Sequence, residues 1–294
     1  MTGERVQEFN SAFTVDSWLN ENTALAAANR RSLAATLAHL VTLINTDRPT
    51  TIGISGAPGS GKSTLSRALV HSLNENAVPA CLLSLDDYYL ARAERERLAR
   101  EFHPLFRQRG VPGTHEIDRL LRDHDRIRAG KIDGLHLPIF DKSQDDRLQK
   151  SHWRMLECVP RVTVIEGWCV GAKPQDQADL LHPVNELERT QDTSGTWRNE
   201  VSQAWNRMYR KLRKRLDQVW YIRVPDWECA VDWRWQQEQQ RLQKNLQSRH
   251  EVVQFLACFE RIVRHMQSSH REWADLTLEL NHSHNIRLPE QNRK

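Results

Sequence analysis

The chain has 294 residues, and its 42 Lys and Arg against 38 Asp and Glu give a formal net charge of +4. The mean hydropathy is −0.68, and no run approaches the ~18 apolar residues of a membrane span, which excludes an integral membrane protein. The start of the sequence leads us to expect no secretory signal. The charge excess is too small for an obligate nucleic-acid binder, although it suits a site for anionic substrates.

Apolar residues at helical spacing predict a helical region that ends before Pro49. The rest of the chain alternates short apolar strands with helical stretches. This alternation favours a parallel sheet covered on both faces, with ligands bound beyond the carboxyl ends of the strands. We therefore expect an α/β fold in which a helical extension (1–48) packs on a larger domain (49–294). Strands are predicted at 51–54, 79–85, 161–165, 219–224 and 276–280, and helices at 62–74, 90–101 and 116–128.

A glycine-rich segment joins the first predicted strand to the next helix, and it reads Gly56-Ala57-Pro58-Gly59-Ser60-Gly61-Lys62-Ser63-Thr64. It fits GxxxxGK[ST] in full and has the strand–loop–helix setting that a phosphate-binding loop requires. Glycines let backbone N–H groups surround phosphate oxygens, and the positive end of the helix faces the same anion. Lys62 is expected to reach the β- and γ-phosphates of ATP, and Ser63 to ligate Mg²⁺. A turn that binds nothing is the structural alternative.

Carboxylates follow two other predicted strands. Asp86 and Asp87 end the second strand, and Glu166 ends the third. A carboxylate after the second strand would lie beside the phosphate loop, where it could accept the proton of an attacking hydroxyl. A helix N-cap is the structural alternative. Because the sequence has no guanine-reading NKxD and the third strand does not end on Asp-Glu, a small-molecule kinase is favoured over a GTPase or a helicase.

Three segments together resemble the phosphoribulokinase, uridine kinase and pantothenate kinase group of P-loop kinases: Gly56–Thr64, Ser84–Leu90 and Val164–Trp168. Four further segments are similar to D-glycerate 3-kinases of the plant and cyanobacterial type and to related ATP-dependent kinases: 109–116, 138–143, 166–171 and 231–238. The resemblance covers roughly residues 50–285. It implies a mostly parallel five-stranded sheet flanked by helices, with a helical lid.

The resemblance also implies a reaction and the residues that carry it. It makes the chain an ATP-dependent, Mg²⁺-dependent kinase of a small-molecule alcohol, with D-glycerate as the leading acceptor and 3-phosphoglycerate as the product. Asp86 would be the base, Glu166 would hold Mg²⁺ through water, and Asp87 would orient its neighbour or contact the acceptor. The alternatives are a kinase of a nucleoside or a pantothenate-like alcohol, and a non-catalytic protein that uses ATP as a switch.

Polar loops supply further candidate residues. Arg109 and His115 could bind an acceptor carboxylate, which Arg matches with two hydrogen bonds. Arg234, in a Trp-rich stretch, could reach the transferred phosphoryl group as a lid arginine. The remaining candidates for the acceptor site are Tyr88, Asp141, Lys142 and Arg147. A solvated turn, an exposed histidine and a surface arginine are the corresponding structural alternatives.

The five cysteines are odd in number and include no CxxC pair, which predicts a reduced, cytoplasmic protein without structural zinc. His282 and His284 have no cysteine or acid cluster near them in the sequence, so they are poor metal candidates. The expected partner is a small hydroxy acid, and neither a membrane nor a nucleic acid is expected.

Overall fold

The computed structural model describes residues 11–23, 25–240 and 248–287, so residues 1–10 of the predicted extension lie outside the described part. Its main sheet has six strands in the order β10-β9-β8-β1-β7-β2. All neighbours are parallel except β9 and β10. The strands are β1 (Thr50–Gly56), β2 (Ala80–Ser84), β7 (Val162–Glu166), β8 (Gln218–Arg223), β9 (Leu276–Leu280) and β10 (Ile286–Arg287).

The five predicted strands are all present, in a mostly parallel sheet. The sixth strand, β10, turns back on β9 through the pair Leu280 and Ile286. This strand was not predicted, because two residues are too short to carry an alternating pattern. Two small antiparallel ladders lie outside the main sheet: β3 (His136–Leu137) with β6 (Arg154–Met155), and β4 (Phe140–Asp141) with β5 (Asp146–Arg147).

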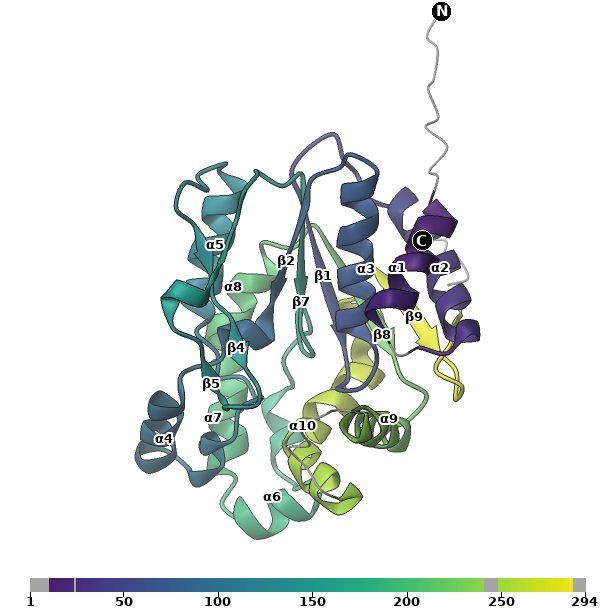
Figure 1. Ribbon diagram of the computed structural model, residues 1–294. Coiled ribbons are helices and arrows are strands. Elements are labelled where there is room, and N and C mark those ends of the chain that lie inside the picture. Colours follow the sequence, from purple (N-terminus) through teal and green to yellow (C-terminus); the bar gives the residue numbers. More distant parts are fainter. Residues whose placement is uncertain (1–10, 24, 241–247, 288–294) are drawn as a thin grey trace, which may run out of the picture.

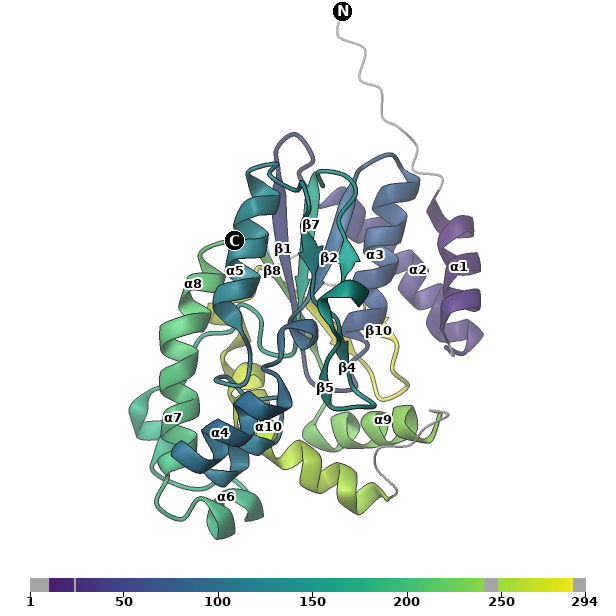
Figure 2. The same cartoon turned by 60° about the vertical axis from the view of Figure 1, so that its left-hand side comes forward.

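Helices cover both faces of the sheet (Figures 1 and 2). Helices α1, α2 and α3 lie on one side and α5 and α8 on the other, while α9 and α10 lie beyond the carboxyl ends of the strands. None of the helices in the described ranges is both long and apolar enough to cross a bilayer. The helices are α1 (Ser11–Asn22), α2 (Ala27–Thr42), α3 (Lys62–Glu75), α4 (Arg92–Glu101), α5 (Ile117–Arg128), α6 (Glu186–Gln191), α7 (Thr196–Ala204), α8 (Arg210–Arg213), α9 (Trp227–Gln239) and α10 (Arg249–Ser269).

The central strands β1 and β7 are buried along their whole length. Ile54 and Val164 have no exposed surface, as expected for strands with helices on both faces. Helix α3 covers them with Leu65, Leu69 and Leu73, which are buried and stand four residues apart on one face. This packing fixes the end of β1 and the start of α3, between which the glycine-rich loop lies.

The N-terminal helices pack onto the same layer. Helix α2 buries an apolar stripe that includes Leu33, Leu37 and Leu40. The Asn29 side-chain amide donates hydrogen bonds to the backbone oxygens of Ser283 and His284, at 2.9 and 3.1 Å. Helix α2 is thereby joined to the turn between β9 and β10, on the side of the sheet that carries α3.

Candidate active site

The phosphate-binding loop runs from the end of β1 at Gly56 to the start of α3 at Lys62. Gly59 and Gly61 have φ of +85° and +83°, a left-handed conformation that glycine adopts without strain. A Cβ at Gly59 would lie 3.0 Å from the backbone oxygen of Ala230 and 3.0 Å from the backbone nitrogen of Arg234. The backbone of α9 therefore packs directly against the loop.

Glu166 stands at the end of β7, in register with Ser84 of β2. Its Oε1 accepts hydrogen bonds from Ser84 Oγ at 2.6 Å and from Ser63 Oγ at 3.1 Å. Its Oε2 is buried and has no hydrogen-bond partner within the described chain. A buried, unpartnered carboxylate oxygen beside the loop hydroxyl is the kind of oxygen donor that Mg²⁺ prefers, so these residues fit the ion.

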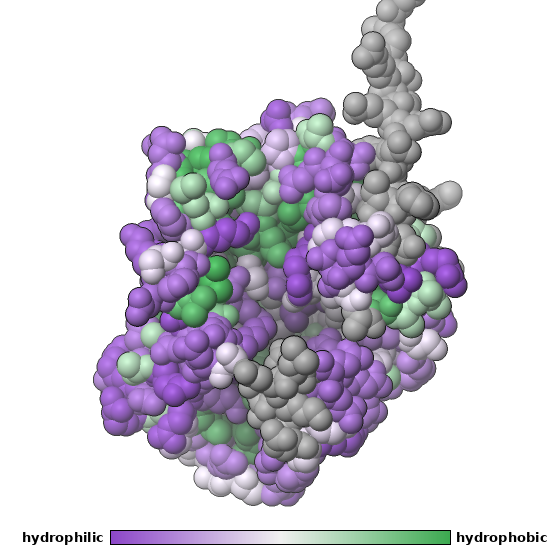
Figure 3. Space-filling model, in the orientation of Figure 1, coloured by the Kyte–Doolittle hydropathy of each residue, from purple (hydrophilic) through white to green (hydrophobic). Residues whose placement is uncertain are grey.

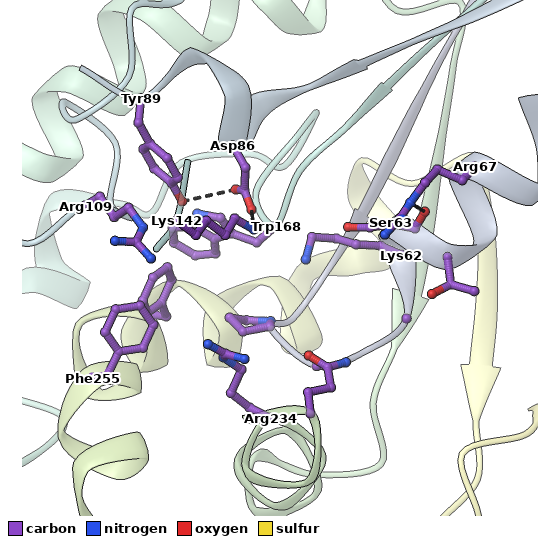
Figure 4. A pocket seen from close by; sticks show the side chains of 16 residues that line it. Lys62, Ser63, Arg67, Asp86, Tyr89, Arg109, Lys142, Trp168, Arg234 and Phe255 are labelled. Carbon is purple, nitrogen blue, oxygen red and sulfur yellow. Dashed lines mark hydrogen bonds and ion pairs between the residues drawn. The ribbon is translucent and has the colours of Figure 1, made fainter. Parts of the chain in front are cut away.

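Asp86 lies in the 3₁₀ turn that follows β2 (Leu85–Tyr88). Its carboxylate accepts from Lys142 Nζ at 2.6 Å and from the Tyr89 hydroxyl at 3.1 Å (Figure 4). Burial by itself raises the pKa of this carboxyl, but the positive charges of Lys142 and Lys62 outweigh it and hold the pKa well below its ordinary value. Asp86 is therefore ionised at neutral pH.

Asp87 has a different environment from its neighbour. Its Oδ1 accepts a hydrogen bond from the backbone N–H of Phe140 in β4, at 3.1 Å. Burial raises its pKa to about 6, and the nearby charge of Asp86 acts in the same direction. Asp87 thus holds the β4–β5 ladder beside the site, while Asp86 alone of the two lines the cavity.

A cavity of about 370 Å³ opens between the phosphate loop, the β2 turn and helices α9 and α10. The face that contains it is hollowed near its centre and surrounded mainly by hydrophilic side chains (Figure 3). Among the described residues that line it, five are cationic and one is acidic, which favours anionic ligands. They are Lys62, Arg67, Arg109, Lys142 and Arg234, with Asp86 as the acid.

Two of these guanidinium groups are held by fixed partners. Arg109 pairs with Asp145 and lies over the Phe140 ring, 5.5 Å from its centroid. Arg234 pairs at 2.8 Å with Glu238, which is fully buried one turn further along α9. The side chain of Arg234 points from α9 toward the space beside Lys62 (Figure 4). Helix α9 therefore brings a positive charge to the loop that it contacts.

Two of the predicted acceptor residues are buried away from the cavity. The Tyr88 hydroxyl donates to Asp123 on α5 at 3.1 Å, and Tyr88 does not line the cavity, whereas its neighbour Tyr89 does. His115 lies 2.5 Å from the Tyr209 hydroxyl and stacks on Tyr89. Burial lowers its pKa to about 3, so a neutral imidazole cannot supply the charge expected for an acceptor carboxylate.

Two other predicted residues also lie outside the cavity. Arg147 donates to Glu116 at 2.8 Å and to the backbone oxygen of Tyr89 at 2.6 Å. Arg147 therefore holds the wall of the cavity in place and does not line the cavity itself. Asp141 accepts from Ser143 Oγ at 2.6 Å in the turn after β4. Both were expected at the acceptor site, and their partners in the protein explain why they do not line the cavity.

Several residues that line the cavity were not among the predicted site residues. Arg67 follows Ser63 by one helical turn, and Gln237 follows Arg234 by three residues, so helical spacing gave a signal for both. Trp168, Phe255 and Phe259 form an aromatic wall, with Trp168 and Phe259 edge to face at 4.8 Å. The two phenylalanines come from α10, for which no local pattern pointed to the site.

A second cavity of about 500 Å³ adjoins the first and shares Thr64, Arg67 and Gln237 with it. Its other walls come from the N-terminal helices, through Trp18 and Asn29 among others, and from the β9–β10 turn. The two cavities together form a cleft that crosses the start of α3.

This fold and this loop define a P-loop nucleotide-binding protein, and known proteins agree. Residues 30–157 match the model of the KAP family P-loop domain. The uncharacterized kinase mug58 of Schizosaccharomyces pombe is 33% identical over 226 residues, covering 71% of this chain and 78% of that protein. The chloroplastic D-glycerate 3-kinase of Arabidopsis thaliana is 28% identical over 200 residues, covering 65% of this chain and 41% of that protein.

Among solved structures, the D-glycerate 3-kinase of Cryptococcus neoformans superimposes with a TM-score of 0.67 at 23% identity, covering 87% of this chain and 94% of that one. This likeness shows the fold. The likeness to mug58 shows the family: the chain belongs to the P-loop kinase family that contains mug58. It is an ATP-dependent phosphotransferase with an alcohol group as acceptor.

Proposed function

We propose that the acceptor is D-glycerate and that the product is 3-phosphoglycerate. The observation that carries this proposal is the charge of the cavity, in which Arg109 and Lys142 stand on the Asp86 side, apart from the phosphate loop. A small hydroxy acid could place its hydroxyl at Asp86 and its carboxylate against these two cations. The D-glycerate 3-kinase of Arabidopsis, by its name, acts on this acceptor, which agrees with the proposal.

In the proposed reaction an acceptor hydroxyl oxygen bonds to the γ-phosphorus of ATP as the bond from that phosphorus to the β–γ bridging oxygen breaks. The hydroxyl proton passes to Asp86. A carboxylate of low pKa is adequate here, because the transition state is loose and the proton moves late. Lys62 and the backbone N–H groups of the loop hold the phosphates, and Arg234 faces the transferred group.

Ser63 and Glu166 would hold Mg²⁺. When bound, the ion neutralises phosphate charge that develops during transfer. The hydrogen bond from Ser63 to Glu166 keeps the Ser63 hydroxyl oxygen and a Glu166 carboxylate oxygen together. The aromatic wall of Trp168 and Phe259 would exclude water from the site.

We further propose that the base and ribose of ATP occupy the second cavity. That cavity adjoins the loop at Thr64 and combines aromatic with amide side chains, which suit a flat, polar ligand. Helices α1 and α2, from the predicted extension 1–48, would then contribute side chains to the nucleotide site of the kinase domain (49–294).

The acceptor is tested by ADP release from Mg·ATP in a coupled assay, without acceptor and then with D-glycerate, L-glycerate, uridine and pantothenate. We expect strong stimulation by D-glycerate alone. Arg109→Met should raise the KM for D-glycerate while leaving the affinity for ATP near its original value, because Arg109 lies away from the phosphate loop.

Stimulation by uridine or pantothenate instead would reject the glycerate assignment and leave the kinase reaction in place. Slow hydrolysis with no stimulation by any of the four acceptors, together with tight ATP binding, would contradict the proposed acceptor class and favour an ATP-dependent switch.

A further inference from the structure

A separate group of metal-ligating side chains lies at the N-terminus of α9, outside the first cavity, which contains Lys62 and Asp86. It consists of Asp226, Cys229 and His282, whose ligand atoms all lie within 4.8 Å of one another. Asp226 caps α9, where its Oδ1 accepts from the backbone N–H of Cys229 at 2.7 Å. His282 comes from the turn between β9 and β10, and its Nδ1 lies 3.3 Å from Cys229 Sγ.

We propose that these three side chains bind a Zn²⁺ ion. Zinc binds Cys sulfur at about 2.3 Å and His nitrogen at about 2.0–2.1 Å, so two such ligands at tetrahedral angles stand about 3.5 Å apart. The observed separation of 3.3 Å between Sγ and Nδ1 therefore needs little adjustment. The carboxylate of Asp226 supplies a third ligand, and water would complete the tetrahedron.

The donor set also selects the kind of ion. A thiolate with an imidazole favours zinc and similar borderline ions, whereas Mg²⁺ requires oxygen ligands such as those of Ser63 and Glu166. The Mg²⁺ that accompanies ATP would therefore not compete for this group. Binding replaces the thiol proton of Cys229, which is released to solvent.

His282 has no cysteine or acid cluster near it in the sequence, but in the folded chain Cys229 and Asp226 lie beside it. Cys229 is 53 residues away along the sequence and becomes its neighbour only because α9 and the β9–β10 turn meet. Spacing rules for metal sites read ligands that are close together in the sequence, so they could not find this group.

An ion at this place would join two elements that border the nucleotide. Helix α9 contacts the phosphate loop at Gly59 and carries Trp233, which stacks on His284 of the turn with ring centroids 4.0 Å apart. Both His282 and Trp233 line the second cavity. The bound ion would therefore hold α9 against the β9–β10 turn. This role does not depend on the identity of the alcohol that the enzyme phosphorylates.

The full chain, with Mg²⁺ in excess and a phosphine reductant, is titrated with Co²⁺ as a spectroscopic substitute for Zn²⁺. We expect one equivalent to produce a thiolate-to-cobalt charge-transfer band, which Zn²⁺ then displaces. Cys229→Ser should abolish the band. Loss of an outer-shell partner alone weakens metal binding by about 10–100-fold, so His282→Asn should weaken it by at least about 100-fold. The matched control is Cys158→Ser, another accessible thiol, which should keep the band.

A second measurement needs no variant. In the unmodified chain, Zn²⁺ should slow alkylation of Cys229 by iodoacetamide at least about tenfold while leaving Cys158 unprotected, as read by peptide mass spectrometry. The absence of the cobalt band, its persistence in Cys229→Ser, or equal alkylation of Cys229 with and without Zn²⁺ would each overturn the assignment. None of these outcomes bears on the acceptor, so failure here is distinct from failure of the proposed function.

Discussion

The Lys142 ammonium lies 2.6 Å from Oδ2 of Asp86. The Tyr89 hydroxyl donates to the other carboxylate oxygen, so each oxygen has a donor within the protein. Each carboxylate oxygen can accept a second hydrogen bond, so an acceptor hydroxyl can bind Asp86 beside these two donors. The side chain of Lys142 is 42% exposed and can move, whereas Tyr89 is buried. An acceptor with its own carboxylate would draw Lys142 toward itself, which links the charge of the acceptor to the positive charge that lowers the pKa of Asp86.

The first prediction concerns the base itself. Asp86→Asn should keep ATP binding and lose phosphoryl transfer by about 10²–10⁴-fold, the usual contribution of a positioned proton acceptor. The amide has the size of the carboxyl and can still accept from Tyr89, so the fold should be retained. Transfer is measured by the coupled assay and ATP affinity by calorimetric titration. Asp141→Asn, in the nearby turn, is the control with full activity, and transfer near the original rate in Asp86→Asn would remove Asp86 from this role.

Lys142 controls the pKa of that base. In Lys142→Met burial still raises the pKa of Asp86, but the main opposing charge is gone, so the pKa rises from its depressed value. Activity needs the ionised carboxylate, and the acid limb of the pH profile of kcat/KM should therefore move to higher pH. The KM for the acceptor should rise as well. Lys142→Arg keeps the charge and should leave the acid limb in place, and an unmoved limb in Lys142→Met would contradict the coupling.

The pKa of Asp87 is raised, whereas that of Asp86 is lowered, and we expect the raised pKa to make the stability of the protein depend on pH. The folded-state pKa of Asp87 is raised to about 6 by burial, so between the unfolded value of 3.8 and about pH 6 the folded state keeps a proton that the unfolded state has lost. Stability therefore falls as pH rises through this window, by an amount on the order of 1–3 kcal/mol. Asp87→Asn keeps an oxygen for the Phe140 N–H and removes the ionisation.

Urea unfolding should accordingly find Asp87→Asn more stable than the original chain at about pH 7.5, with the difference vanishing below about pH 4. A variant that is less stable at the higher pH would mean that the ionised carboxylate of Asp87 is better satisfied than its single hydrogen bond to Phe140 indicates.

The phosphate-binding loop and the central strands could be predicted from the sequence, because each is specified by residues that are adjacent in the chain. The loop from Gly56 to Thr64 carries its own motif, and the apolar runs of β1 and β7 identify buried parallel strands. The placement of Glu166 beside Ser63 follows from the motif and the strand that ends there, since parallel strands bring their carboxyl ends to one edge.

The remaining features depend on contacts between distant segments. Whether Tyr88 or Tyr89 faces the cavity is decided by Asp123, 35 residues from Tyr88, which takes the Tyr88 hydroxyl. His115 reads as a loop histidine in the sequence, yet Tyr209, 94 residues away, covers it. The aromatic wall of α10 depends on where that helix crosses the strand ends. The pattern of a single sequence does not show which distant segments come into contact.

The last prediction tests the contact between α9 and the phosphate loop. A Cβ at Gly59 would lie 3.0 Å from two backbone atoms of α9, in a residue with φ of +85°. Gly134 has φ of +62° with nothing within 4 Å of an added Cβ, so it is a matched control for backbone strain alone. Gly134→Ala should cost about 1–2 kcal/mol of unfolding free energy and leave ATP affinity unchanged.

Gly59→Ala must also move α9, because backbone atoms cannot rotate aside as a side chain can. We expect it to lose more stability than Gly134→Ala and to weaken ATP binding by about tenfold or more, since 1.4 kcal/mol of lost contact corresponds to that factor. Unfolding curves and calorimetric ATP titrations of the two variants provide the comparison. Equal losses of stability, with ATP affinity intact in both variants, would show that the contact with α9 does not hold the phosphate loop in place. The loop contact would then not position Arg234 beside the transferred phosphoryl group.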